Sequence, residues 1–111
     1  VDDKAKKLKK YQKVVDEKKT VLDSKKETLK TAKEKTEKAK TDLEAAIKIE
    51  TTLNADSSTT DEKKKAAKTA KDLAQTKRDE AVKEQTKAAD AVETAQKEYD
   101  KAVKDKNDVA E

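Results

Sequence analysis

Two stretches of about fifty residues without a Gly or Pro flank a short polar segment at residues 51–61. Gly and Pro are the residues that most readily interrupt a helix, so nothing outside this segment is expected to end one. Inside the segment, Thr, Asn, Asp and Ser side chains compete with the helix for backbone hydrogen bonds. The sequence therefore predicts an all-α chain with helices at about 3–52 and 61–110 and a turn at 53–60.

The turn also contains a start signal for the second helix. Either Thr59 or Thr60 can cap that helix, and residues 59–62 match a capping box in which Glu62 reaches back to the cap. Asn54 and Asp56 are residue types that favour turns through local side-chain bonds. We therefore predict that these five polar side chains shape the turn and the cap.

Composition limits the kind of core that this chain can build. Apolar residues make up 32% of the chain and charged residues 49%. This apolar fraction is too small for an ordinary globular core in a chain of 111 residues. Such a chain either forms an elongated helical assembly with a narrow seam or stays disordered. The spacing of the apolar residues decides between these alternatives.

Apolar residues recur every seventh position in both halves, as in a coiled coil. In the first half, the first column is Leu8, Val15, Leu22, Leu29, Thr36 and Leu43. The second column of that half is Tyr11, Lys18, Lys25, Ala32, Ala39, Ala46 and Leu53. The columns of the second half are Ala67, Ala74, Ala81, Ala88, Ala95, Ala102 and Val109, and Lys71, Arg78, Gln85, Val92, Tyr99 and Lys106.

A single antiparallel register pairs the columns of the first half with those of the second half and agrees with the position of the predicted turn. When residue numbers that sum to 117 are paired, Leu22 meets Ala95 and the midpoint falls inside the predicted turn. We predict one antiparallel coiled-coil hairpin over residues 1–111, a rod about 75 Å long at roughly 1.5 Å per helical residue. Its seam is predicted to contain Leu8, Tyr11, Val15, Leu22, Leu29, Leu43, Ala74, Ala81, Ala88, Val92, Ala95, Tyr99 and Ala102.

Some large apolar residues lie beside the seam, and the sequence leaves their role open. Val14, Val21, Ile49 and Val103 either widen the core of the hairpin or meet a neighbouring module or second chain. Near the turn, we expect a smaller apolar cluster of Ile47, Ile49, Leu53 and Leu73. The chain is accordingly expected to be a monomer or a weak homodimer.

Charge is spread unevenly along the chain, whose formal net charge is +4. Residues 1–52 carry 16 Lys against 11 acids, and six Lys between Lys4 and Lys13 have no acid among them. No interleaved aromatics or groove-reading motif accompany this run, so we interpret it as a solvated helix end and expect no nucleic-acid partner. No apolar run approaches the roughly 20 residues of a membrane span, so no membrane insertion is expected.

The residues that usually carry enzyme chemistry are missing. The chain has no His, Cys or Gly, which excludes thiol catalysis, zinc sites of the Cys/His type and phosphate-binding glycine loops. Residues 56–62 superficially resemble a calcium loop but lack its Gly and spaced acids. We therefore expect no catalytic, cofactor-binding or metal-binding residues and no enzymatic activity.

The segment "LAQTKRDEAVKEQTKAADAVETAQKEYDKAVKDKNDVAE", with its units "KAADAVETAQ" and "AQKEYDKAV", carries a resemblance to a known class. It resembles the Lys/Ala/Glu/Thr-rich helical stalks of Gram-positive cell-wall-anchored surface proteins, such as surface-exclusion proteins, aggregation proteins and streptococcal adhesins. The resemblance implies a secreted, extracellular chain at the bacterial cell wall. It further implies protein partners, namely neighbouring domains of the same protein or a protein of a host or partner cell.

Four hypotheses follow for the role of the chain. The first is a non-enzymatic coiled-coil spacer or adhesive rod of a bacterial surface protein. The alternatives are a helical domain that binds a host protein, a disordered stress-protective chain, and a parallel dimer of one continuous helix. Because the chain begins at Val1 and not Met, we expect it to be part of a longer protein.

Overall fold

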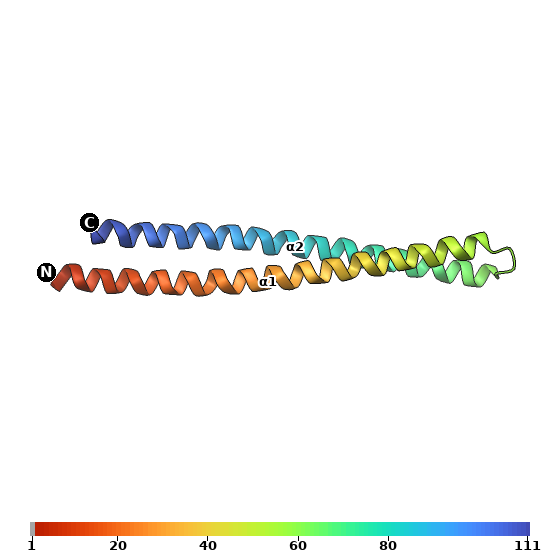
Figure 1. Cartoon of the computed structure of the whole chain (residues 1–111), viewed down its shortest axis with the longest axis horizontal. Helices are drawn as coiled ribbons and strands as arrows, with labels where there is room; N and C mark the ends of the chain where they lie inside the picture. The colour runs from red at the N-terminus through yellow and green to blue at the C-terminus, as the bar shows by residue number, and fades with distance from the viewer. Residues whose placement is uncertain (1) are drawn as a thin grey trace. The chain divides into compact units, whose positions relative to one another are not determined.

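The computed structural model describes residues 2–111, with side chains from residue 3 onward. It contains two antiparallel helices, α1 (Asp2–Ala55) and α2 (Asp61–Ala110), as Figure 1 shows. The predicted all-α helical hairpin is confirmed, and the alternative of one continuous helix is wrong because α1 ends before the turn. The prediction of α2 at 61–110 agrees with the structure, whereas α1 extends three residues beyond the predicted residue 52.

The hairpin divides into two compact units. One unit joins the first thirty residues, ending at Lys30, to Lys87–Glu111, and the other comprises Thr31–Thr86. Each unit is a pair of antiparallel helical segments, one from α1 and one from α2. The turn belongs to the second unit, and the first unit holds the start of α1 and the end of α2.

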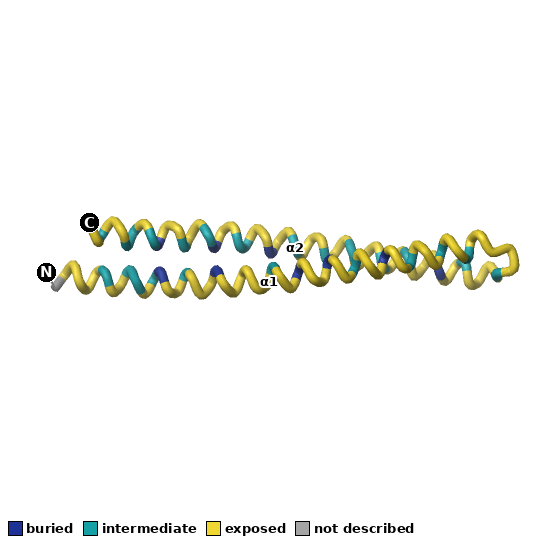
Figure 2. Tube along the Cα trace, viewed as in Figure 1, coloured by how far each residue is buried: buried dark blue, intermediate teal, exposed yellow. Residues whose placement is uncertain are grey.

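In the first unit, large side chains of α1 lie against small side chains of α2. Leu22 and Ala95, both 4% exposed, are the most buried apolar residues of this unit. Figure 2 shows the buried stretches of its two helical segments facing each other. Its buried residues are Val15, Leu22, Ala88, Ala95 and Ala102. All five belong to the heptad columns, so the spacing of the sequence predicts which side of each helix is covered.

In the second unit, a polar residue lies in the line of buried side chains. The buried residues here are Ala32, Thr36, Leu43 and Ala67. Alanine at two of these four positions lets the helices approach closely but removes little apolar area from water. This unit is therefore expected to owe much of its stability to helix propensity and to the polar contacts described below.

The other seven predicted seam residues are all half-buried. They are Leu8, Tyr11, Leu29, Ala74, Ala81, Val92 and Tyr99. Two helices alone cover a seam from one direction and leave its flanks open to solvent, so partial exposure follows from the architecture. Lys25, whose ammonium group favours water, is the one position of the four predicted columns that is exposed.

Candidate interaction surfaces

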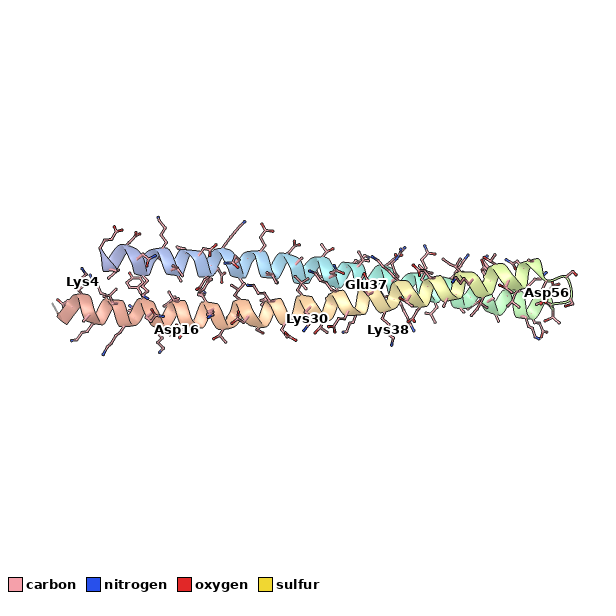
Figure 3. The ribbon with its side chains drawn as sticks, in the orientation of Figure 1. Lys4, Asp16, Lys30, Glu37, Lys38 and Asp56 are labelled. Carbon is pink, nitrogen blue, oxygen red and sulfur yellow. The ribbon has the colours of Figure 1, made fainter. Side chains whose placement is uncertain are left out.

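The turn is organised by the carboxylate of Asp56, which Figure 3 labels at the end of the hairpin. Its Oδ1 accepts hydrogen bonds from the Ser58 backbone amide at 2.9 Å and the Ser58 hydroxyl at 2.6 Å. Its Oδ2 accepts a bond from the Thr59 hydroxyl at 2.9 Å. These bonds from Ser58 and Thr59 stabilise the charged form and lower the pKa of Asp56 below its ordinary value of 3.8. No described residue has a positive φ, so this carboxylate closes the turn without the glycine that many turns require.

The cap of α2 differs from the predicted capping box by one residue. Thr60 is the cap, because its hydroxyl accepts a hydrogen bond from the Lys63 amide at 3.3 Å. Lys63 and not Glu62 thus occupies the third helical position, so the predicted box with Glu62 is wrong. The Thr59 hydroxyl is directed to Asp56 instead. Asn54, predicted in the turn, lies in the last turn of α1, which continues to Ala55.

Thr36 makes a polar contact across the seam of the second unit. Its hydroxyl lies 3.0 Å from the Ala32 carbonyl oxygen on its own helix and 3.2 Å from the Ala81 carbonyl oxygen on α2. A threonine hydroxyl has one hydrogen, so the two carbonyl groups share it. The contact gives a hydrogen-bond partner to the hydroxyl of Thr36, a residue that is only 4% exposed. It also agrees with the predicted register, since 36 and 81 sum to 117.

An ion pair between Glu50 and Lys71 crosses the helices close to the turn. Lys71 Nζ lies 3.0 Å from Glu50 Oε1, and the side chains are only 27% and 17% exposed, respectively. The hydrogen bond and charge of Glu50 raise the pKa of Lys71 above its ordinary value of 10.5. Sequence reasoning missed this pair, although Glu50 continues the column seven residues after Leu43 and Lys71 stands in a column of α2.

An ion pair joins the two helical segments of the first unit, and the basic run of this unit is exposed. Lys18 Nζ lies 3.4 Å from Glu98 Oε2, with both side chains substantially exposed, so its contribution to stability is small. The six lysines between Lys4 and Lys13 are all exposed, and Figure 3 labels Lys4 among them. This exposure agrees with a solvated helix end.

A groove runs beside the seam of the second unit, with a volume of about 500 Å³. Its alanine floor consists of Ala39, Ala70, Ala74 and Ala81, and Leu73, which is 56% exposed, also lines it. The charged residues on its rims are Lys35, Lys38 and Asp42 from α1, and Lys77, Glu80 and Glu84 from α2. The groove is open to solvent and does not enclose a site for a small molecule.

The large apolar residues beside the seam divide into two groups. Val14 and Val103 are half-buried and widen the core of the first unit, whereas Val21 and Ile49 are exposed. The apolar cluster predicted near the turn is wrong as a buried cluster: only Leu53 is half-buried, while the exposed members are Ile47, Ile49 and Leu73. The physical reason is that a seam between two helices covers the heptad columns but not the positions beside them.

Two long helices with many acidic side chains make up the part of the chain that the structure describes, residues 2–111. Neither helix there has a stretch long and apolar enough to cross a membrane. Its acidic side chains nowhere gather in a group of three that could hold a metal ion. Comparisons of the chain with family models, with curated proteins and with solved structures find no match.

Proposed function

We propose that this chain is a non-enzymatic coiled-coil module, a spacer or adhesive rod of a bacterial surface protein. The observation that supports the proposal most is the narrow line of burial. The nine buried residues of the described chain all belong to heptad columns, and eight of them are Ala, Val or Leu. Such narrow burial suits a chain whose role is to keep two helices paired.

The open groove and the charged surface agree with this role. Catalysis usually needs a pocket that excludes water and shifts the pKa of an acid or base toward neutrality. The shifted pKa of Asp56 belongs to the carboxylate that closes the turn, and the shifted pKa of Lys71 belongs to the ammonium group that pairs with Glu50. Both shifts favour the charged form already present at neutral pH, so neither prepares a group for proton transfer.

The proposed location at the Gram-positive cell wall is based on the resemblance of the sequence to alanine-rich stalks. The start of α1 and the end of α2 lie together in one compact unit, and the turn belongs to the other unit. We propose that the module is anchored through those chain ends and exposes its turn to partners. The partners that we propose are therefore proteins, either adjoining domains or proteins of a facing cell.

A host-protein-binding domain is the second candidate, and a specific observation favours it. In the part of the chain that the structure describes, five large apolar side chains are exposed, which is a common feature of protein-binding surfaces. They are Val21, Ile47, Ile49, Leu73 and Val82. The disordered stress-protective chain has no comparable support, because the structure is helical over both halves.

The spacer and the binding domain are distinguished by two kinds of variant. One kind changes the length of the hairpin, and the other changes its surface charges. An epitope inserted between Ser57 and Ser58 reports the height of the turn above the cell wall when the chain is displayed there. Deleting residues 37–43 together with 74–80 removes one matched heptad from each helix and preserves the register. A spacer predicts reduced antibody access after this deletion.

A matched variant keeps every heptad column but exchanges the exposed Lys and Glu residues outside the columns. A spacer predicts that this variant gives unchanged antibody access. A binding domain predicts that the same variant loses adhesion to host protein while the helix content, measured by circular dichroism, is retained. Unchanged access after the heptad deletion would reject the spacer role.

A further inference from the structure

The groove of the second unit combines an apolar surface with an ordered pattern of charge. Leu73, which lines the groove, is followed on the same face of α2 by Lys77, Glu80 and Glu84, at spacings of four, three and four residues. On α1, residues 35, 38, 42 and 49 likewise share one face, and Ile49 is 56% exposed. The groove is thus continued toward the turn by a large exposed apolar residue on each helix.

The two rims of the groove carry opposite charge at corresponding heights. In the register that sums to 117, Lys35 lies level with residue 82, between Glu80 and Glu84, and Lys38 lies level with residue 79, next to Glu80. Asp42 lies level with residue 75, close to Lys77. In the described part of the chain none of these six side chains forms an ion pair, although five other pairs are present.

We propose that this groove binds a second copy of the same chain, face to face, with the two hairpins parallel and related by a twofold axis along their length. Such an axis places α1 of one copy over α2 of the other. The Lys35 and Lys38 rim of each copy then meets the Glu80 and Glu84 rim of its partner. Leu73 and Ile49 of both copies are covered, and the alanine floor allows close approach.

In the alternative antiparallel dimer, fewer of these charges meet an opposite charge on the partner. It places α1 over α1 and α2 over α2, so Lys35 meets Asp42 of the partner and Lys77 meets Glu80. Lys38 and Glu84 then lack opposite charges. Only the parallel arrangement pairs all six charges of the groove, and this complementarity selects both the occupant and its orientation.

The test uses analytical ultracentrifugation over a concentration series at low salt. The wild-type chain is expected to change from its monomer mass of 12.4 kDa to twice that mass as concentration rises. The double variant Lys35→Glu/Lys38→Glu makes both rims acidic, and Glu80→Lys/Glu84→Lys makes both rims basic. Each variant alone is expected to remain monomeric, and an equimolar mixture is expected to regain the dimer mass.

The control is Lys26→Glu/Lys33→Glu, which reverses two exposed charges of α1 that lie one heptad apart and outside the groove. It is expected to dimerise like the wild type. Circular dichroism checks that each variant keeps its helices. A second readout uses the variant Ser57→Cys, in which this residue is the only cysteine and carries a dye. Energy transfer between the dyes of two copies is high only when their turns lie at the same end of the dimer.

Three results would overturn the proposal. One is a wild-type chain that stays monomeric at millimolar concentration. The second is a mixture of the two folded charge variants that does not form dimers. The third is a dimer without energy transfer between the turns, which would indicate the antiparallel arrangement. None of these results bears on the spacer role, because a rod can act as a spacer whether or not it pairs sideways.

Discussion

The hydroxyl of Thr36 lies 3.2 Å from the carbonyl oxygen of Ala81, and this contact links the seam of α1 to the backbone of α2. Both residues belong to heptad columns, and their register is the one that places the turn at the middle of the chain. A buried polar contact of this kind favours one alignment over others shifted by a heptad. It therefore contributes to specificity more than to the free energy of unfolding.

Replacing Thr36 tests this interpretation. Thr36→Val keeps the shape and removes a shared hydrogen bond, so the unfolding free energy is expected to change by no more than about 1 kcal/mol. Thr36→Asp buries a charge and is expected to cost at least about 2 kcal/mol. Urea denaturation followed by circular dichroism measures both. Thr41→Val is the control, because Thr41 makes the same bond within its own helix but is exposed.

Leu22 should be far more sensitive than an exposed leucine. Leu22→Ala removes a side chain that is 4% exposed, and the expected cost is about 2–3 kcal/mol of unfolding free energy. Leu73→Ala, at a side chain that is 56% exposed, is expected to stay within about 0.5 kcal/mol when measured at dilute concentration. Equal losses in the two variants would contradict the assignment of the seam.

Exchanging the charges of Glu50 and Lys71 tests whether their pair stabilises the hairpin. Glu50→Lys and Lys71→Glu each bring like charges together, so both are expected to lower the melting temperature. The double exchange restores opposite charges and is expected to recover part of the loss. If the melting temperature of the double variant falls by the sum of the two single decreases, the pair contributes no coupling energy.

The raised pKa of Lys71 sets the pH range in which this pair acts. Its contribution is complete below the ordinary value of 10.5 and is lost as pH rises through the raised pKa in the folded state. The difference in melting temperature between wild type and Lys71→Met should therefore be constant near neutral pH and shrink above pH 10.5. A difference that is independent of pH throughout would show that the charge of Lys71 does not matter.

The lowered pKa of Asp56 predicts the opposite pH dependence at the turn. Its contribution is present above the unfolded value, taken as 3.8, and is lost as pH falls through the lower pKa of the folded state. Asp56→Ala should melt below the wild type at neutral pH, and the gap should close in acid. Ser57→Ala is the matched control, since Asp56 bonds to Ser58 and Thr59 and not to Ser57. A gap that widens in acid would contradict this assignment.

Heptad spacing predicted the two helices, their antiparallel pairing and the buried columns, because burial in a two-helix seam depends only on which side of each helix a residue occupies. It could not predict how polar side chains choose partners. The Thr59 hydroxyl donates its hydrogen bond to the Asp56 carboxylate, and the Thr60 hydroxyl caps α2. The heptad columns placed Ile49 beside the seam but could not show whether another side chain covers it, and the small cluster expected for Ile49 and Leu73 near the turn leaves both side chains exposed.

Disulfide trapping of one designed cysteine pair tests the central claim, the antiparallel register, most directly. The chain has no Cys, so Ala32→Cys/Gln85→Cys introduces a single pair at positions that sum to 117. A shifted control, Ala32→Cys/Arg78→Cys, moves the second cysteine by one heptad, or roughly 10 Å along the helix. The register predicts rapid intramolecular oxidation of the first pair and little of the second. Preferential oxidation of the shifted pair, or of neither pair within a helical monomer, would contradict it.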